Sequence, residues 1–125
     1  MSSAIAKLNN YRQSPRKVRL VADSIKGKKA NEALLNLDFT VKRASSPISK
    51  LLSSAIANAK NLGLDIDKLV VSKIEVNSGK ILYRRMPVSR GSAHPIRKRT
   101  SHITIILEEK EPKKAKVKIS KEDKK

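Results

Sequence analysis

The sequence contains no cysteine, no tryptophan and very few other aromatic residues, and these absences exclude several kinds of protein. Without cysteine the chain has no disulfide, no thiolate metal site and no cysteine nucleophile. Aromatic residues make up only 2% of the chain and are Tyr11, Phe39 and Tyr83. A protein that recognises RNA by stacking bases on an aromatic platform therefore does not fit this composition.

Glycine clusters and long apolar runs are also missing. Gly27, Gly63, Gly79 and Gly91 each stand alone, whereas the phosphate cradles of P-loop and dinucleotide-binding proteins need several glycines close together. No segment approaches the roughly 18 apolar residues of a membrane span, and the first residues lack the basic and apolar blocks of a signal peptide. We expect a soluble, intracellular protein that is not inserted into a membrane.

Acidic residues are scarce and unevenly placed. The chain has 125 residues with 29 Lys+Arg against 11 Asp+Glu, a net charge of +18 at pH 7. No acid precedes Asp23, and none occurs from Val76 to Leu107. Residues 1–109 hold 21 bases and 8 acids, a net charge of +13, and residues 110–125 hold 8 and 3, a net charge of +5. Because this charge repels itself, we expect a polyanionic partner, with nucleic acid first and an anionic membrane surface second.

The aliphatic residues suffice for one modest core, and their spacing predicts helices followed by strands. Leu, Ile, Val and Phe total 33 of 125 residues, more than a disordered chain carries. Pro47 either kinks the third helix or marks its start, and the spacing leaves both open. The first predicted helix starts at Pro15, is capped by the Ser14 hydroxyl and ends at Gly27. The second covers 31–37, and the third runs from Thr40 or Ser46 to Leu62. The predicted strands cover 69–76, 80–88 and 96–107, with a turn at 77–79 and a possible first strand at 5–10.

The segment from Tyr83 to Arg99 reads as a long basic ribbon with Gly91 near its tip. An isolated two-stranded ribbon is marginal in water, and this one also holds like charges close together. Arms of about ten residues at roughly 3.3 Å each project on the order of 30 Å from the body. We infer a ribbon that is ordered by a partner supplying negative charge on several sides, as folded RNA does.

Residue patterns for catalysis or metal binding are weak. His94 and His102 lie among arginines that repel a cation, so a surface role or a phosphate contact is the better interpretation. Asp65 and Asp67 are the one close carboxylate pair, and they read as loop residues before a strand. We expect no enzyme activity, no metal and no cofactor.

Basic residues of the two acid-free windows are the candidate RNA-binding residues. A solvated charged surface is the alternative, and it explains the first window better than the hairpin. A DNA-reading helix-turn-helix does not fit, because the second helix is short and apolar, whereas a nucleoid-type DNA-architectural protein fits charge and size equally well. The candidates are Arg12, Arg16, Lys17, Arg19, Lys80, Arg84, Arg85, Arg90, Arg97, Lys98, Arg99 and His102.

Three segments together resemble one family. They are Ser14-Pro-Arg-Lys-Val-Arg-Leu-Val-Ala-Asp-Ser-Ile-Lys-Gly27, Ser54-Ala-Ile-Ala-Asn-Ala59 and Ile96-Arg-Lys-Arg-Thr-Ser-His-Ile-Thr-Ile-Ile-Leu107. In order and spacing the chain is similar, over residues 4–109, to the bacterial-type large-subunit ribosomal protein twenty-two family. It departs at the hairpin tip, where Met86 and Val88 occupy positions that are commonly basic in the family.

The resemblance implies an α+β fold in which three helices pack on a three-stranded antiparallel sheet with a long β-hairpin extension. One domain would span 1–110 with the hairpin at about 81–100, and the Lys-rich composition of 111–125 predicts a disordered basic tail. By resemblance, the partners are large-subunit ribosomal RNA of the 23S type, neighbouring large-subunit proteins and the nascent polypeptide, in a cytoplasmic or organellar ribosome. The body would lie near the polypeptide exit, and the tunnel-facing tip would be Ser89, Arg90, Gly91, Ser92 and Ala93.

Overall fold

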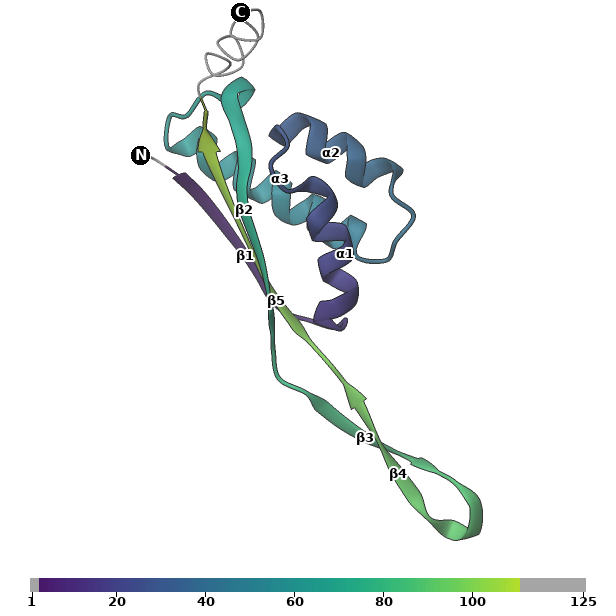
Figure 1. Ribbon diagram of the computed structural model, residues 1–125. Coiled ribbons are helices and arrows are strands. Elements are labelled where there is room, and N and C mark those ends of the chain that lie inside the picture. Colours follow the sequence, from purple (N-terminus) through teal and green to yellow (C-terminus); the bar gives the residue numbers. More distant parts are fainter. Residues whose placement is uncertain (1–2, 111–125) are drawn as a thin grey trace, which may run out of the picture.

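The computed structural model describes residues 3–110, and the predicted tail at 111–125 lies outside them. The described chain combines three α-helices with antiparallel strands, as the α+β prediction requires (Figure 1). The helices are α1 (Pro15–Ile25), α2 (Ala30–Phe39) and α3 (Ser45–Asn61), with short 3-10 turns η1 (Ile66–Lys68) and η2 (Ser89–Gly91). The strands are β1 (Ser3–Tyr11), β2 (Leu69–Ser78), β3 (Leu82–Pro87), β4 (Ala93–Lys98) and β5 (Ser101–Glu109).

A three-stranded sheet of order β1-β5-β2 carries the three helices on one face (Figure 1). Period-two alternation in the central strand β5 buries Ile103, Ile105 and Leu107 completely against the helices. The first strand is confirmed, and it buries its small residues Ala4 and Ala6 rather than its large ones. Helix α3 therefore lies close against β1, with which it makes more contacts than with any other strand.

Helix α1 follows its prediction closely. Pro15 opens the helix, and Val18, Val21, Ala22 and Ile25 form the buried stripe. Gly27 has a φ of +79°, the left-handed region in which a glycine readily ends a helix. The predicted cap is wrong, because the Ser14 side chain makes no capping hydrogen bond.

The other two helices settle the open points of the prediction. Helix α3 begins at Ser45, so Pro47 lies in its first turn, where a missing N–H costs nothing and no kink is needed. The buried Ser45 Oγ donates to the carbonyl oxygens of Lys42 and Thr40, at 2.8 and 3.2 Å, and so orders the loop before α3. Helix α2 is longer than the predicted 31–37 at both ends.

The predicted strand at 96–107 is wrong in one respect, because it is interrupted at Arg99 and Thr100. Strand β4 pairs only with β3, and β5 pairs with β1 and β2. The predicted turn at 77–79 is wrong too, since Asn77 and Ser78 pair with β5. The bend into the hairpin instead occurs where the Gly79 N–H donates to the Thr100 carbonyl oxygen at 2.9 Å and Thr100 Oγ1 donates to the Lys80 carbonyl oxygen at 2.6 Å.

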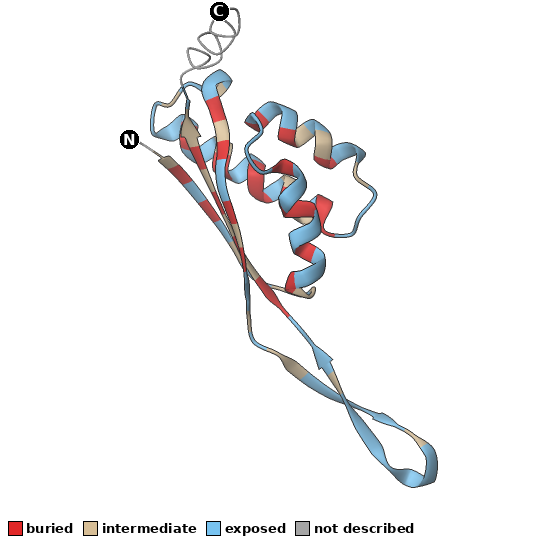
Figure 2. Cartoon of the chain, in the orientation of Figure 1, coloured by how far each residue is buried: buried red, intermediate tan, exposed pale blue. Residues whose placement is uncertain are grey.

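The β3-β4 hairpin projects from the sheet away from the helices, and it contributes no buried residue (Figure 2). Its register pairs Leu82 with Lys98 at the base and Pro87 with Ala93 near the tip. At the tip, the Val88 N–H donates to the Ser92 carbonyl oxygen at 2.9 Å, and Arg90 adopts a left-handed φ of 59°. The hairpin therefore gives the body no apolar core.

The outer edges of the sheet carry hydrogen bonds from the rest of the chain. On β2, the Val71 N–H donates to the Lys28 carbonyl oxygen at 2.9 Å, and the Val71 carbonyl oxygen accepts from the Gly27 N–H at 3.0 Å. On β1, Asn58 Nδ2 of α3 donates to the Ile5 carbonyl oxygen at 2.9 Å. The segment that links α1 to α2 thus covers part of the β2 edge.

Candidate nucleic-acid interface

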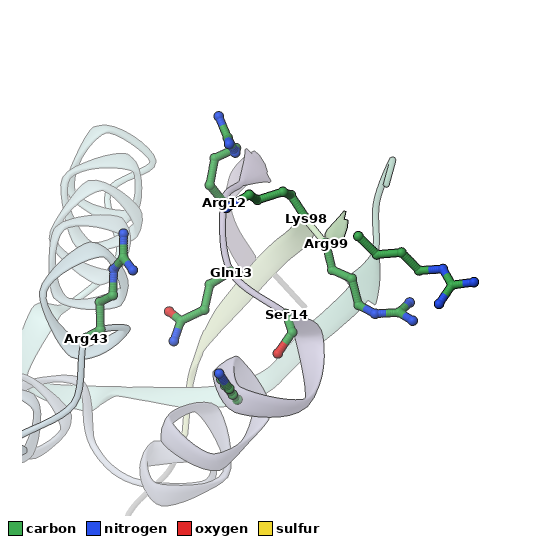
Figure 3. Close-up of a pocket in the computed structure, with 8 residues that line it drawn as sticks. Arg12, Gln13, Ser14, Arg43, Lys98 and Arg99 are labelled. Atoms are coloured by element: carbon green, nitrogen blue, oxygen red, sulfur yellow. The ribbon is translucent and has the colours of Figure 1, made fainter. Parts of the chain in front are cut away.

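A basic groove lies where the hairpin joins the body (Figure 3). It is an open hollow of about 680 Å³ formed by the turn before α1, the loop before α3 and the last residues of β4 with Arg99. Six of its eight lining residues are cationic and none is acidic. The lining residues are Arg12, Gln13, Ser14, Lys17, Arg43, Arg97, Lys98 and Arg99.

A second hollow, which we call the flanking groove, shares Ser14, Lys17 and Arg99 with the basic groove. It also measures about 680 Å³ and runs along the exposed side of α1 to the end of β2. Its cations come from α1, apart from Arg99, and it again contains no acid. The lining residues are Ser14, Pro15, Arg16, Lys17, Arg19, Leu20, Ser78 and Arg99.

Hydrogen bonds order the turn before α1 and join it to the start of β5. The fully buried Ser101 Oγ donates to the Gln13 carbonyl oxygen at 2.6 Å, which joins the start of β5 to this turn. The Gln13 side chain accepts from the Tyr11 hydroxyl at 3.0 Å, and the Gln13 N–H donates to the Tyr11 carbonyl oxygen at 2.9 Å. Arg12 therefore lies near Lys98 and Arg99 in the folded chain.

Few cations of the described chain are neutralised internally. Within residues 3–110 the one ion pair joins Lys73 Nζ to Glu75 Oε2 at 2.9 Å on β2. The hydrogen bond and the charge of Glu75 raise the pKa of Lys73 above its ordinary value. The groove cations have no such carboxylate neighbour, so their mutual repulsion favours an external polyanion.

The structure divides the predicted RNA-binding residues into two sets. It gathers Arg12, Lys17, Arg97, Lys98 and Arg99 around the basic groove, and it places Arg16 and Arg19 along the flanking groove. Arg12 lies in the turn before α1, whereas Arg16 and Arg19 lie on the helix. The remaining bases, Lys80, Arg84, Arg85 and Arg90, are exposed along the hairpin and its approach.

His102 and Arg19 each make a contact within the protein. The Nδ1 atom of His102 accepts a hydrogen bond from the Asn10 N–H at 3.1 Å, which links β5 to the end of β1. Arg19 donates to the Val76 carbonyl oxygen of β2. Both residues therefore serve the fold, and their RNA-binding role stays a prediction.

Arg43 was missed by reasoning from the sequence. It lies in the loop before α3 and faces the turn that carries Gln13 and Ser14 (Figure 3). It follows Lys42 in a stretch from Phe39 to Leu64 that contains no acid, and the packing of α3 against β1 brings it to the groove. The absence of acids around it is the one local signal that could have indicated this position.

Groups that could support catalysis are engaged in turns. Asp65 Oδ1 accepts from the Asp67 N–H at 3.1 Å and caps η1, and Glu109 accepts from the Asp65 N–H. Over residues 3–110, no group of three or more His, Asp and Glu side chains could hold a metal ion. None of the helices in this range is both long and apolar enough to cross a membrane.

Comparison with known proteins gives one consistent result. The model of the family described as ribosomal protein L22p/L17e matches residues 6–108. Large ribosomal subunit protein uL22 of Metamycoplasma arthritidis is 56% identical over 108 residues, which cover 86% of this chain and 51% of that protein. The uL22 proteins of Syntrophotalea carbinolica and Latilactobacillus sakei are each 49% identical, over 86% and 89% of this chain and 98% and 96% of their own lengths. The chain thus spans about half of the first relative and nearly all of the other two.

Proposed function

The chain belongs to the ribosomal protein L22p/L17e family, whose members are structural and not enzymes, and on that premise we propose that it binds large-subunit ribosomal RNA during subunit assembly. Its proposed partners are ribosomal RNA of the 23S type and neighbouring large-subunit proteins, and the protein is located in the ribosome. The resemblance read from three segments of the sequence is confirmed by the family match.

The basic groove is the observation that carries this proposal. Six cations from three segments far apart in the sequence converge there, and no carboxylate offsets them. Guanidinium groups form bidentate hydrogen bonds with phosphate oxygens, and the folded chain already holds these groups together. The fold brings these residues together, so phosphates from two RNA segments can be joined at one place, at the cost of ordering the exposed side chains.

The hairpin is the second part of the proposed RNA surface. Its side chains are exposed on both strands, and Arg84, Arg85 and Arg90 have no ion pair within the described chain. Such a ribbon gains stability only when an anionic partner surrounds it, which supports a path through folded RNA. On the family resemblance, the tip from Ser89 to Ala93 would line the nascent-chain tunnel, with the body near its exit.

Filter binding of the full chain to large-subunit ribosomal RNA tests the proposal. Log–log plots of affinity against salt should fall steeply, by roughly 0.7–0.9 per phosphate neutralised. A flat salt response would contradict the electrostatic mechanism. Sedimentation of cell lysate in high salt distinguishes this function from that of a DNA-architectural protein. A ribosomal protein should sediment with the large subunit, whereas a DNA-binding protein should not.

A further inference from the structure

The flanking groove differs in chemistry from the basic groove that it adjoins. Both hollows measure about 680 Å³, and they share Ser14, Lys17 and Arg99. Six of the eight residues that line the basic groove are cationic, and none is aliphatic. Four of the eight residues that line the flanking groove are cationic, and Pro15 and Leu20 also line it. A site suited to phosphate therefore lies beside a site of mixed chemistry.

Leu20 is the aliphatic side chain that this mixed site exposes. It is 63% exposed and lies outside the buried stripe of α1. Leu20 follows Arg16 by four residues and Lys17 by three, so the three side chains are neighbours on the helix surface. A phosphate oxygen gains nothing from an aliphatic side chain, whereas the apolar face of a nucleobase is removed from water by it.

The guanidinium of Arg19 is a plane of restricted orientation on the same hollow. Its Nη2 and Nε atoms both donate to the Val76 carbonyl oxygen of β2, at 2.8 and 3.2 Å, and the residue remains exposed. Nucleobases of single-stranded RNA stack on arginine planes of this kind. Because two hydrogen bonds already restrict the rotation of this guanidinium, stacking on it requires less ordering than stacking on a free arginine.

The charges around the flanking groove favour a nucleotide over other occupants. Asp23 is the one acid of α1, and it lies one turn beyond Arg19, outside the lining of the hollow. On β2, Glu75 is paired with Lys73. The four groove cations thus outnumber the acid near them, and an apolar peptide would leave them without a counter-charge. One exposed leucine is too little apolar surface for a membrane, whereas a nucleotide brings both an anion and an apolar ring.

We propose that the flanking groove binds one unpaired nucleotide of the large-subunit ribosomal RNA. The base packs on Leu20 and stacks on Arg19. The adjoining phosphates lie against Arg16, Lys17 and Arg99. The hollow falls within the roughly 300–1,000 Å³ of small-ligand sites, so a nucleotide fits it. The proposal rests on the proposed function, and the shared lining residues let one RNA strand pass from the basic groove into the flanking groove.

Filter binding of the full chain to large-subunit ribosomal RNA tests the contact with Leu20. Leu20→Ser should lower the affinity about tenfold at every salt concentration and leave the salt slope unchanged, because the lost contact carries no charge. Leu35→Ser is the matched control, since Leu35 is an equally exposed leucine of α2 that lines neither groove. Equal affinities of the two variants would overturn the proposal.

The salt slope of the unchanged chain reports on the proposed function separately. A steep slope combined with equal affinities of the two variants contradicts the nucleotide site and leaves RNA binding intact. A flat slope contradicts electrostatic RNA binding by the chain and, with it, the nucleotide site.

Acylation of RNA 2′-hydroxyl groups in the same complexes identifies the bound nucleotide. The unchanged chain and Leu35→Ser should both protect an unpaired nucleotide that Leu20→Ser leaves reactive. Protection elsewhere should be the same in all three complexes, because the groove cations are unchanged. Identical protection in all three complexes, or a difference confined to base-paired RNA, contradicts the proposal.

A double-mutant cycle tests the stacking on Arg19. Arg19→Lys keeps the charge but removes the plane, so it should lower the affinity about fivefold with an unchanged salt slope. Circular dichroism at the assay temperature verifies that this variant is folded. Combined with Leu20→Ser, the loss should be smaller than the product of the two single losses, because both side chains contact the same base. A purely structural role for Arg19 predicts a loss equal to that product, and this result would exclude the stacking contact.

Discussion

The guanidinium of Arg19 on α1 donates two hydrogen bonds to the carbonyl oxygen of Val76 on β2, from Nη2 at 2.8 Å and from Nε at 3.2 Å. Strand β2 is at the edge of its sheet, so no further strand competes for this oxygen. Arg19 thus fastens the helix to the sheet and also lines the flanking groove. An arginine in an acid-free window serves the fold here.

Replacing Arg19 by alanine should lower the free energy of unfolding by about 1 kcal/mol, because hydrogen bonds to a charged donor are lost while solvent replaces part of the interaction. Chemical denaturation followed by circular dichroism measures the loss. Arg16→Ala is the control, since Arg16 is exposed on the same helix. Equal losses of stability from the two substitutions would contradict a structural role for Arg19.

Arg43→Gln should weaken binding to ribosomal RNA and reduce the salt slope by about one, because one phosphate contact of the basic groove is lost. Salt titrations by filter binding give the slope. Lys60→Gln removes one charge from the exposed side of α3, away from both grooves. If both variants change the salt slope equally, the groove cations contribute no more to RNA binding than other exposed cations do.

Gly79→Ala should cost about 1–3 kcal/mol, because an added Cβ would stand 2.5 Å from Thr100 Oγ1. A double-mutant cycle with Thr100→Ala isolates this clash. Thr100→Ala alone loses the hydrogen bond to the Lys80 carbonyl oxygen, so each single substitution destabilises. The double substitution should destabilise the protein by less than the sum of the two single substitutions. Strict additivity of the free energies would show that the added Cβ does not clash with the Thr100 side chain.

Deleting residues 84–99 should leave a body that unfolds cooperatively, since the hairpin contributes nothing to the hydrophobic core. Thermal melts followed by circular dichroism compare the shortened chain with the full one. The helical signal should persist, and affinity for ribosomal RNA should fall with a shallower salt slope. Disappearance of the thermal transition would mean that body and hairpin form one cooperative unit.

Periodicity predicted the elements of the body well because their apolar faces are regular. The apolar stripe from Val18 to Ile25 predicted a helix, and the alternation from Ile103 to Leu107 predicted a strand. The apolar residues of both segments are buried as expected. The family resemblance implied a three-stranded antiparallel sheet with a hairpin extension, and the strand order β1-β5-β2 comes from the structure.

The failures occur where tertiary contacts decide. Nothing local marks Arg99 and Thr100 as a break, at which Thr100 lies against Gly79 in the segment that follows β2. For the same reason, the sequence predicted five of the six cations of the basic groove as RNA-binding residues and missed Arg43. The five predicted members lie near α1 and the hairpin, whereas Arg43 reaches the groove through the packing of α3.

The loop from Gly27 to Lys29 matters for a newly made copy of the chain. Such a copy must persist in a crowded cell, where a free strand edge is a template for pairing with another chain and hence for aggregation. Because Lys28 and Gly27 already occupy both backbone groups of Val71, part of the β2 edge is closed to a second strand. The loop that ends one helix thereby shields part of the sheet from pairing with another chain.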